Sequence, residues 1–181
     1  MINSYIFINI LTISRILFAA IIYYLLSNDG NYILALILFF AAGLSDYFDG
    51  YLSRKYQKTS QLGEILDPIA DKILLIFIFF GLAINLSSYL IGFMGSIIIS
   101  REIWVSALRD FNSRNNNLAA TKVTYLAKIK TSIQFITIFV YLIGLASSIM
   151  LFIVIADILL IISTLITLYT GYNYTFNTFN N

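Results

Sequence analysis

The sequence contains no cysteine and no histidine, and its one proline is Pro68. Without cysteine, disulfides and thiolate chemistry are excluded. Without histidine, acid–base or metal chemistry falls to carboxylates, lysine, tyrosine or water. Charged residues make up only 11% of the 181 residues, against roughly 25% in an average soluble domain. Because 60% of the residues are hydrophobic, lipid is expected to surround much of the chain. The net charge of +2 is too small to indicate nucleic acid as a partner.

Long apolar stretches predict an all-α integral membrane protein with six transmembrane helices. Each stretch is long enough to span about 30 Å of hydrocarbon. The six stretches cover residues 6–27, 31–49, 64–86, 88–108, 126–146 and 149–171. A tight turn is expected at Ser147-Ser148, because one helix over the last two stretches would be implausibly long for a bilayer.

No linker rich in proline or serine divides the chain, so residues 1–181 are expected to form a single membrane domain. Arg15 interrupts the first apolar stretch, and no small-residue cleavage site follows it at the right distance. The first stretch is therefore not expected to be a cleaved signal peptide.

Positive charges are distributed unequally between the connections of the predicted helices. The second and fourth connections carry or adjoin eight basic residues, whereas the first, third and fifth carry none. These residues are Arg54, Lys55, Lys58, Arg109, Arg114, Lys122, Lys128 and Lys130. The positive-inside rule therefore places both basic connections and both termini in the cytoplasm.

Four aspartates lie around the second connection. Asp46 and Asp49 close the second predicted helix, and Asp67 and Asp71 open the third, so both pairs are expected at the cytoplasmic face. Residues three or four apart lie on one face of a helix, so each pair can direct its carboxylates one way. Four such carboxylates repel one another, and divalent cations relieve that repulsion. Oxygen ligands without His or Cys suit Mg²⁺, Mn²⁺ or Ca²⁺, an arrangement that recurs in phosphoryl transfer. The alternative is that these aspartates are simply solvated at helix ends.

The same stretch resembles the signature of the CDP-alcohol phosphatidyltransferase family. It reads Asp46-Tyr-Phe-Asp49-Gly50-Tyr-Leu-Ser53-Arg54 and, eight residues later, Gly63-Glu-Ile-Leu-Asp67-Pro-Ile-Ala-Asp71. Ser53 alone departs from the signature, which has alanine at that position. The resemblance implies six transmembrane helices and an active site at the cytoplasmic side. It also implies that Asp46, Asp49, Asp67 and Asp71 hold two Mg²⁺ or Mn²⁺ ions, with Asp71 as general base.

A nucleotide site is also implied by the resemblance. Its residues would be Asp49, Gly50, Ser53, Arg54 and Gly63. The two glycines would let the backbone approach the cytidine nucleotide, and Arg54 would help to hold it. As alternatives, Gly50 could cap a helix C-terminus, and Arg54 could be a charge that fixes the topology.

Four stretches outside the signature resemble the phosphatidylglycerophosphate synthases of this family. They are Asn9-Ile-Leu-Thr-Ile-Ser-Arg15, Ser100-Arg-Glu-Ile-Trp-Val-Ser-Ala-Leu-Arg-Asp110, Ala127-Lys-Ile-Lys-Thr131 and Leu168-Tyr-Thr-Gly-Tyr-Asn-Tyr174. The resemblance implies glycerol 3-phosphate as the acceptor. This acceptor is a dianion and calls for cations, for which Arg109, Lys128 and Lys130 are the candidates. The alternative is that the lysines only flank membrane spans.

Two acids in the predicted spans remain to be placed. Glu102 is expected to neutralise a nearby cation. Asp157 lies deep in the last span, where it either pairs with Arg101 or lines a polar cavity.

Taken as a whole, the resemblance implies transfer of a phosphatidyl group from CDP-diacylglycerol to glycerol 3-phosphate by direct displacement in the bacterial cytoplasmic (inner) membrane. Members of the family are often dimers, which leaves a homodimer open. One alternative is another acceptor, such as inositol phosphate or serine. Another is a divalent-cation transporter, because carboxylates in membranes also mark ion paths. Against the transporter, all four aspartates cluster at one face, and only Asp157 could continue a path.

Overall fold

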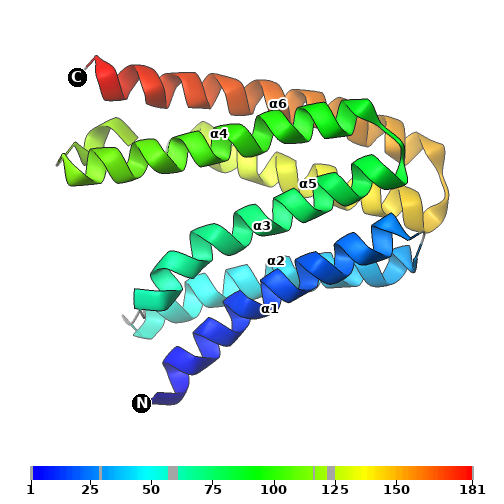
Figure 1. Ribbon diagram of the computed structural model, residues 1–181, viewed down its shortest axis with the longest axis horizontal. Coiled ribbons are helices and arrows are strands. Elements are labelled where there is room, and N and C mark those ends of the chain that lie inside the picture. Colours follow the sequence, from blue (N-terminus) through cyan, green and yellow to red (C-terminus); the bar gives the residue numbers. More distant parts are fainter. Residues whose placement is uncertain (1, 29, 57–60, 116, 122–124, 181) are drawn as a thin grey trace. The chain divides into compact units, whose positions relative to one another are not determined.

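The computed structural model is helical almost throughout its described part, which comprises residues 2–28, 30–56, 61–115, 117–121 and 125–180. Side chains are described for these residues except 2–9, 47, 49–56, 61, 62, 64, 65, 67 and 118. The elements are α1 (Ile2–Ser27), α2 (Tyr32–Tyr56), α3 (Gln61–Asn85), α4 (Tyr89–Arg114), the 3-10 helix η1 (Leu118–Thr121), α5 (Tyr125–Ser147) and α6 (Met150–Phe179), shown in Figure 1. The six long helices confirm the predicted all-α fold.

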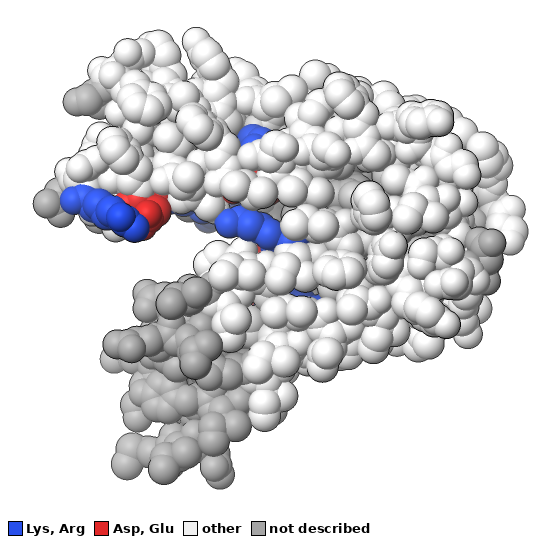
Figure 2. Space-filling view, viewed as in Figure 1, with Lys and Arg blue, Asp and Glu red and all other residues white. Residues whose placement is uncertain are grey.

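Five of these helices, all except α2, are long and apolar enough to cross a membrane. In α2 the apolar part is shorter and covers Tyr32–Asp46, although the helix continues to Tyr56. The described surface on the face shown in Figure 2 is almost entirely uncharged. Such a surface fits contact with lipid, so the chain is an integral membrane protein, and a sixth crossing by α2 stays a prediction.

Tight turns close α3 and α5 where the sequence has pairs of serines. Ser87 and Ser148 have φ angles of 47° and 55°, the left-handed conformation that commonly follows the last helical residue. The next residue in each case bonds back across the last turn, since Ser88 N–H donates to the Ala83 carbonyl at 3.0 Å. The turn predicted at Ser147-Ser148 is confirmed, because α5 ends at Ser147 and α6 begins at Met150.

By its contacts, the chain divides into two compact units. Unit 1 comprises residues 1–88 and 145–147, and unit 2 comprises residues 89–144 and 148–181.

In unit 1, α1 packs against both α2 and α3. Ala19, Ile22 and Leu26 are spaced three and four residues apart, so they share one face of α1, and all three are fully buried. At the end of the unit, Asn85 joins all three helices. Its Nδ2 donates to the Leu26 carbonyl at 2.8 Å and to the Tyr32 hydroxyl at 3.0 Å. The apolar contacts and the hydrogen bonds of Asn85 together hold α1, which carries Arg15, against α2 and α3, which carry the four aspartates.

In unit 2, α4 and α6 lie side by side, and η1 contacts both (Figure 1). Three side-chain hydrogen bonds join the two long helices: Arg101 to Thr170 at 2.8 Å, Trp104 to Thr175 at 2.9 Å and Asn112 to Thr178 at 2.9 Å. Helix α5 is joined to α6 by Gln134, which donates to Thr167 at 3.2 Å. Bonds of this kind are typical of helices that associate in lipid, where apolar burial alone gives no preference for a helix neighbour over an acyl chain.

Candidate functional site

The signature residues lie on α2 and α3 of unit 1. Asp46 and Asp49 are on α2, and Asp67 and Asp71 are on α3, so each pair is held at helical spacing as predicted. Gly50 lies inside α2, which continues to Tyr56, so the alternative that it caps the helix is wrong. On α3, Gly63 is buried.

The side chains of several predicted site residues are outside the described part of the structure. These are Asp49, Ser53, Arg54 and Asp67, and for Gly50 only the helical backbone is described. The predicted roles of these residues therefore stay predictions.

Arg15 of α1 brings the first and last aspartates of the signature together. Its Nη1 donates a hydrogen bond to Asp71 Oδ1 at 2.6 Å, and its Nη2 lies 3.3 Å from Asp46 Oδ1. The Arg15 side chain is fully buried, whereas the side chains of Asp46 and Asp71 are 61% and 55% exposed. Each carboxylate is thus held from the protein side and is open to solvent or ligand on its other side.

Sequence reasoning missed this role of Arg15, which was considered only as an interruption of an apolar stretch and as the last residue of a stretch that resembles the phosphatidylglycerophosphate synthases. A usable signal was present, because Arg15 is the single charged residue of α1. An ionised side chain within a membrane span needs a partner, and the sequence offers aspartates on the neighbouring helices.

The described pair of aspartates is suited to a hard divalent cation. Carboxylate oxygens are the ligands that Mg²⁺ and Mn²⁺ prefer, and the chain has no His or Cys that would favour a softer metal. Among the side chains that the structure describes, no group of three metal-ligating residues comes together. Asp46 and Asp71 would be two ligands of such a site, and the remaining two candidates, Asp49 and Asp67, lie outside the described side chains.

In unit 2, Glu102 binds two buried cations. The Lys130 ammonium and Arg101 Nη1 both donate to Glu102 Oε1, the latter at 3.2 Å. Lys130 and Arg101 are 5% and 7% exposed, and the prediction that Glu102 neutralises a nearby cation is confirmed by its ion pairs with both. Lys130 is therefore already paired, whereas Lys128 is exposed.

A third cation, Arg109, adjoins this group through Tyr174. The guanidinium carbons of Arg101 and Arg109 each lie 5.7 Å from the centre of the Tyr174 ring, a distance at which cation–π attraction acts. Arg101, Arg109 and Lys130, which we call the cation cluster, carry three positive charges, and Glu102, which pairs with Arg101 and Lys130, supplies one negative charge, so two positive charges are in excess. An excess of cations within membrane-spanning helices favours the binding of an anion.

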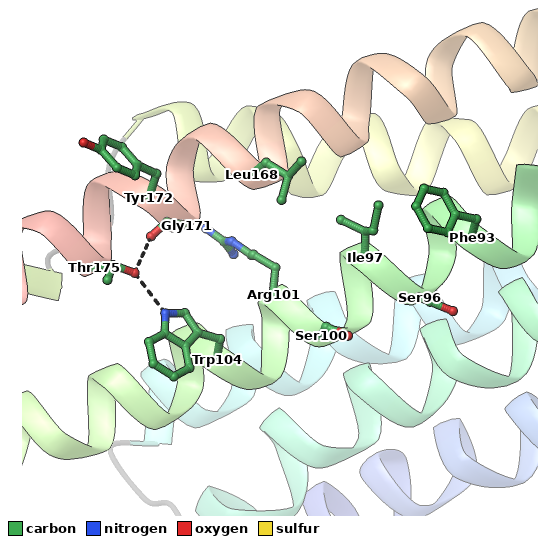
Figure 3. Close-up of a pocket in the computed structure, with 10 residues that line it drawn as sticks. All are labelled: Phe93, Ser96, Ile97, Ser100, Arg101, Trp104, Leu168, Gly171, Tyr172 and Thr175. Atoms are coloured by element: carbon green, nitrogen blue, oxygen red, sulfur yellow. Dashed lines mark hydrogen bonds between the residues drawn. The ribbon is translucent and has the colours of Figure 1, made fainter.

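A groove of about 650 Å³ lies beside the cluster, between α4 and α6 (Figure 3). Arg101 extends from α4 towards Gly171, where an added Cβ would lie 2.9 Å from Arg101 Cγ. The absence of a side chain at Gly171 thus gives Arg101 the room to reach Thr170. Trp104 lines the same groove and donates to Thr175, which in turn donates to the Gly171 carbonyl at 3.0 Å (Figure 3).

Asp157 pairs with Tyr141 and not with Arg101. Its Oδ1 accepts a hydrogen bond of 2.5 Å from the hydroxyl of Tyr141, which is fully buried. Of the two alternatives for Asp157, the pairing with Arg101 is therefore wrong, since Arg101 binds Glu102 and Thr170 instead.

Comparison with known proteins agrees with these features of the sequence and structure. Residues 6–169 match the family model for CDP-alcohol phosphatidyltransferase. Several similar proteins are named CDP-diacylglycerol–glycerol-3-phosphate 3-phosphatidyltransferase. The one from Rickettsia felis is 34% identical over 173 residues, which are 92% of this chain and 91% of the relative. The one from Haemophilus influenzae is 35% identical over 136 residues, 75% of this chain and 73% of the relative. The chain belongs to the CDP-alcohol phosphatidyltransferase family.

Proposed function

We propose that the chain transfers the phosphatidyl group of CDP-diacylglycerol to sn-glycerol 3-phosphate, which gives phosphatidylglycerol phosphate and CMP. The observation that carries the proposal is the convergence of Asp46 and Asp71, the ends of the family signature, on one buried arginine. The names of relatives that match most of the chain supply the donor and the acceptor. The family match extends over both units, which supports residues 1–181 as one catalytic domain.

The four aspartates are assigned to two Mg²⁺ or Mn²⁺ ions. When bound, such ions neutralise the pyrophosphate of the donor and make CMP a better leaving group. Asp71 accepts the proton of the glycerol 3-phosphate hydroxyl as that oxygen attacks the lipid-linked phosphorus. The bond from this phosphorus to the CMP oxygen breaks, and CMP leaves with the electron pair. Arg15 donates a hydrogen bond to Asp71 Oδ1 and so holds this carboxylate in a fixed position.

The nucleotide is assigned to Asp49, Gly50, Ser53, Arg54 and Gly63 by their match to the family signature. Gly63 lies buried in α3. Substitution of Gly63 by alanine is expected to raise KM for CDP-diacylglycerol without changing KM for the acceptor, measured by CMP release.

The phosphate of the acceptor is assigned to Arg109, Lys128 and Lys130. The excess charge of the cation cluster supports this assignment, because a phosphate dianion would balance two positive charges. In Arg109→Gln, KM for glycerol 3-phosphate is expected to rise about tenfold or more, the loss of one charge-assisted hydrogen bond. Arg114→Gln is the matched control, since Arg114 is exposed and pairs with Asp110 at 2.8 Å. Equal KM values in both variants would remove Arg109 from the acceptor site.

The identity of the product tests the reaction itself. Purified protein in detergent receives CDP-diacylglycerol, Mg²⁺ and radiolabelled glycerol 3-phosphate, and the label is measured in the lipid extract. Transfer of the label to a lipid with two phosphates is expected. Label that enters lipid only from serine or inositol phosphate would keep the family chemistry and replace the acceptor.

Both termini and the active site are assigned to the cytoplasmic side of a bacterial inner membrane, and the basic residues of the second and fourth connections support this orientation. Because the chain has no cysteine, single cysteines report topology without background. Ser87→Cys, in the third connection, is expected to react with an impermeant maleimide in intact cells. Asn115→Cys, in the fourth, is expected to react only after the cells are opened. The reverse pattern would invert the proposed orientation.

A further inference from the structure

Arg15 lies on the protein side of the signature aspartates, and we propose that it is a positioning residue that sets Asp46 and Asp71 for metal binding. This inference rests on the proposed function, since it takes the aspartates as metal ligands. It adds a residue from outside the signature, on α1, to the machinery of the site.

The geometry of Arg15 matches that role. One guanidinium reaches two helices, because Nη1 contacts Asp71 on α3 and Nη2 contacts Asp46 on α2. Both contacts use the Oδ1 atom of the carboxylate. A guanidinium is planar and directs its donors in a fixed fork, so one side chain sets the position of Asp71 Oδ1 by a hydrogen bond and that of Asp46 Oδ1 by an ion pair. Groups that orient metal ligands in this way typically change metal affinity by 10- to 100-fold when they are removed.

Burial strengthens the case. Arg15 is fully buried in a helix that crosses the membrane, where an arginine without a counter-ion would be costly. The two carboxylates are more than half exposed and have water available. Arg15 therefore needs the aspartates to compensate its buried charge, whereas water can solvate the aspartates without Arg15. What the aspartates receive from Arg15 is orientation and one inner positive charge.

Orientation and charge act in opposite directions on metal affinity. The fixed orientation favours a divalent cation, whereas the positive charge of Arg15 opposes it. Arg15→Lys separates the two effects, because lysine keeps the charge but is a single flexible point donor that does not reproduce the fork. A decrease in metal affinity in Arg15→Lys therefore reports the loss of orientation alone.

The experiment measures Mn²⁺ binding by electron paramagnetic resonance, with purified wild-type protein, Arg15→Lys and the control Arg114→Lys, in detergent and without substrate. Arg114 is an exposed arginine of α4 that pairs with a neighbouring residue of the same helix, so its substitution controls for the loss of a guanidinium. Size-exclusion profiles and melting temperatures compare the folded state of the three proteins. The Mg²⁺ concentration at half-maximal CMP release is measured on the same samples.

We expect Arg15→Lys to bind Mn²⁺ about 10- to 100-fold more weakly than wild type, with a parallel rise in the Mg²⁺ requirement, and Arg114→Lys to match wild type. Wild-type Mn²⁺ affinity in a folded Arg15→Lys would overturn the positioning role and leave the proposed function intact. If wild type bound Mn²⁺ but released no CMP from CDP-diacylglycerol, the proposed function would fail, and the Mn²⁺ comparison would still decide the role of Arg15. Absence of Mn²⁺ binding by wild type would overturn both.

If Arg15→Lys did not fold, the decisive comparison would be the loss of Mn²⁺ affinity that Asp46→Asn causes in wild type and in Arg15→Met. The inference requires the loss of Mn²⁺ affinity from Asp46→Asn to be smaller when Arg15 is absent, and equal losses would overturn it.

Discussion

Substitution of Glu102 by glutamine is expected to destabilise unit 2 strongly. The glutamine side chain would keep the shape and one acceptor oxygen, so the change removes only the charge. In the wild type, this one acid serves Lys130 and Arg101, which are 5% and 7% exposed. Without it, both cations stay buried in membrane-spanning helices with no carboxylate partner among their described contacts.

The magnitude follows from the burial of the three groups. Loss of one partner of a buried ion pair costs about 3–5 kcal/mol, because a buried charge is left uncompensated. Glu102 is itself 21% exposed, so water compensates part of the loss, and the lower end, about 3 kcal/mol, is expected. A neutral hydrogen bond between membrane helices contributes only about 0.6 kcal/mol on average. The measured loss can therefore distinguish a buried ion pair from a neutral hydrogen bond.

The assay is reversible unfolding in mixed micelles of detergent and SDS, followed by circular dichroism. The double variant Glu102→Gln/Lys130→Met is the informative control, because it also removes one of the buried cations. Its free energy of unfolding is expected to lie above that of Glu102→Gln. A loss below about 1 kcal/mol in Glu102→Gln would show that the ion pairs contribute no more than neutral hydrogen bonds do. A further loss in the double variant would show that Lys130 is not held by the charge of Glu102.

Two more substitutions test contacts in unit 2. Gly171→Ala would place a Cβ 2.9 Å from Arg101 Cγ and 3.1 Å from its Nε, and the overpacking is expected to cost about 1–3 kcal/mol; an unchanged free energy of unfolding would show that Arg101 can move aside. Tyr141→Phe removes the donor of the 2.5 Å hydrogen bond to Asp157. The free energy of unfolding is expected to fall by about 1 kcal/mol while turnover at saturating substrate is unchanged. A loss of turnover in the folded variant would place this pair in the reaction.

Much of the fold was predictable because the signals for it are local. Apolar runs of about 20 residues predict spans, and the serine pairs mark the turns that follow α3 and α5. The helix ends were less predictable. Helix α2 continues to Tyr56, beyond its apolar part, because hydrophobicity reports contact with lipid and the backbone hydrogen bonds of a helix do not end at the membrane surface.

The signature was predictable, and so was the need of Arg15 for an acidic partner, but which aspartates Arg15 contacts was not. Spacing along α2 and α3 places the aspartates at helical intervals, whereas the pairing of Arg15 with Asp46 and Asp71 depends on how α1 packs against those helices. Likewise, Glu102 is adjacent to Arg101 in sequence but reaches Lys130 on another helix only in the packed unit. Contacts between residues far apart in sequence depend on helix rotation and depth, which a single sequence does not encode in a readable pattern.

The most direct test of the proposed activity is CMP release by purified wild-type protein from CDP-diacylglycerol and Mg²⁺. The acceptors compared are glycerol 3-phosphate, inositol phosphate, serine and none, each with and without chelator, and Asp71→Asn serves as the inactive reference. Release is expected only with glycerol 3-phosphate, and it should disappear with chelator and in Asp71→Asn. Release that continued in chelator, or that Asp71→Asn left near wild type, would contradict the metal-assisted displacement with Asp71 as base, and absence of release with every acceptor would contradict the activity itself.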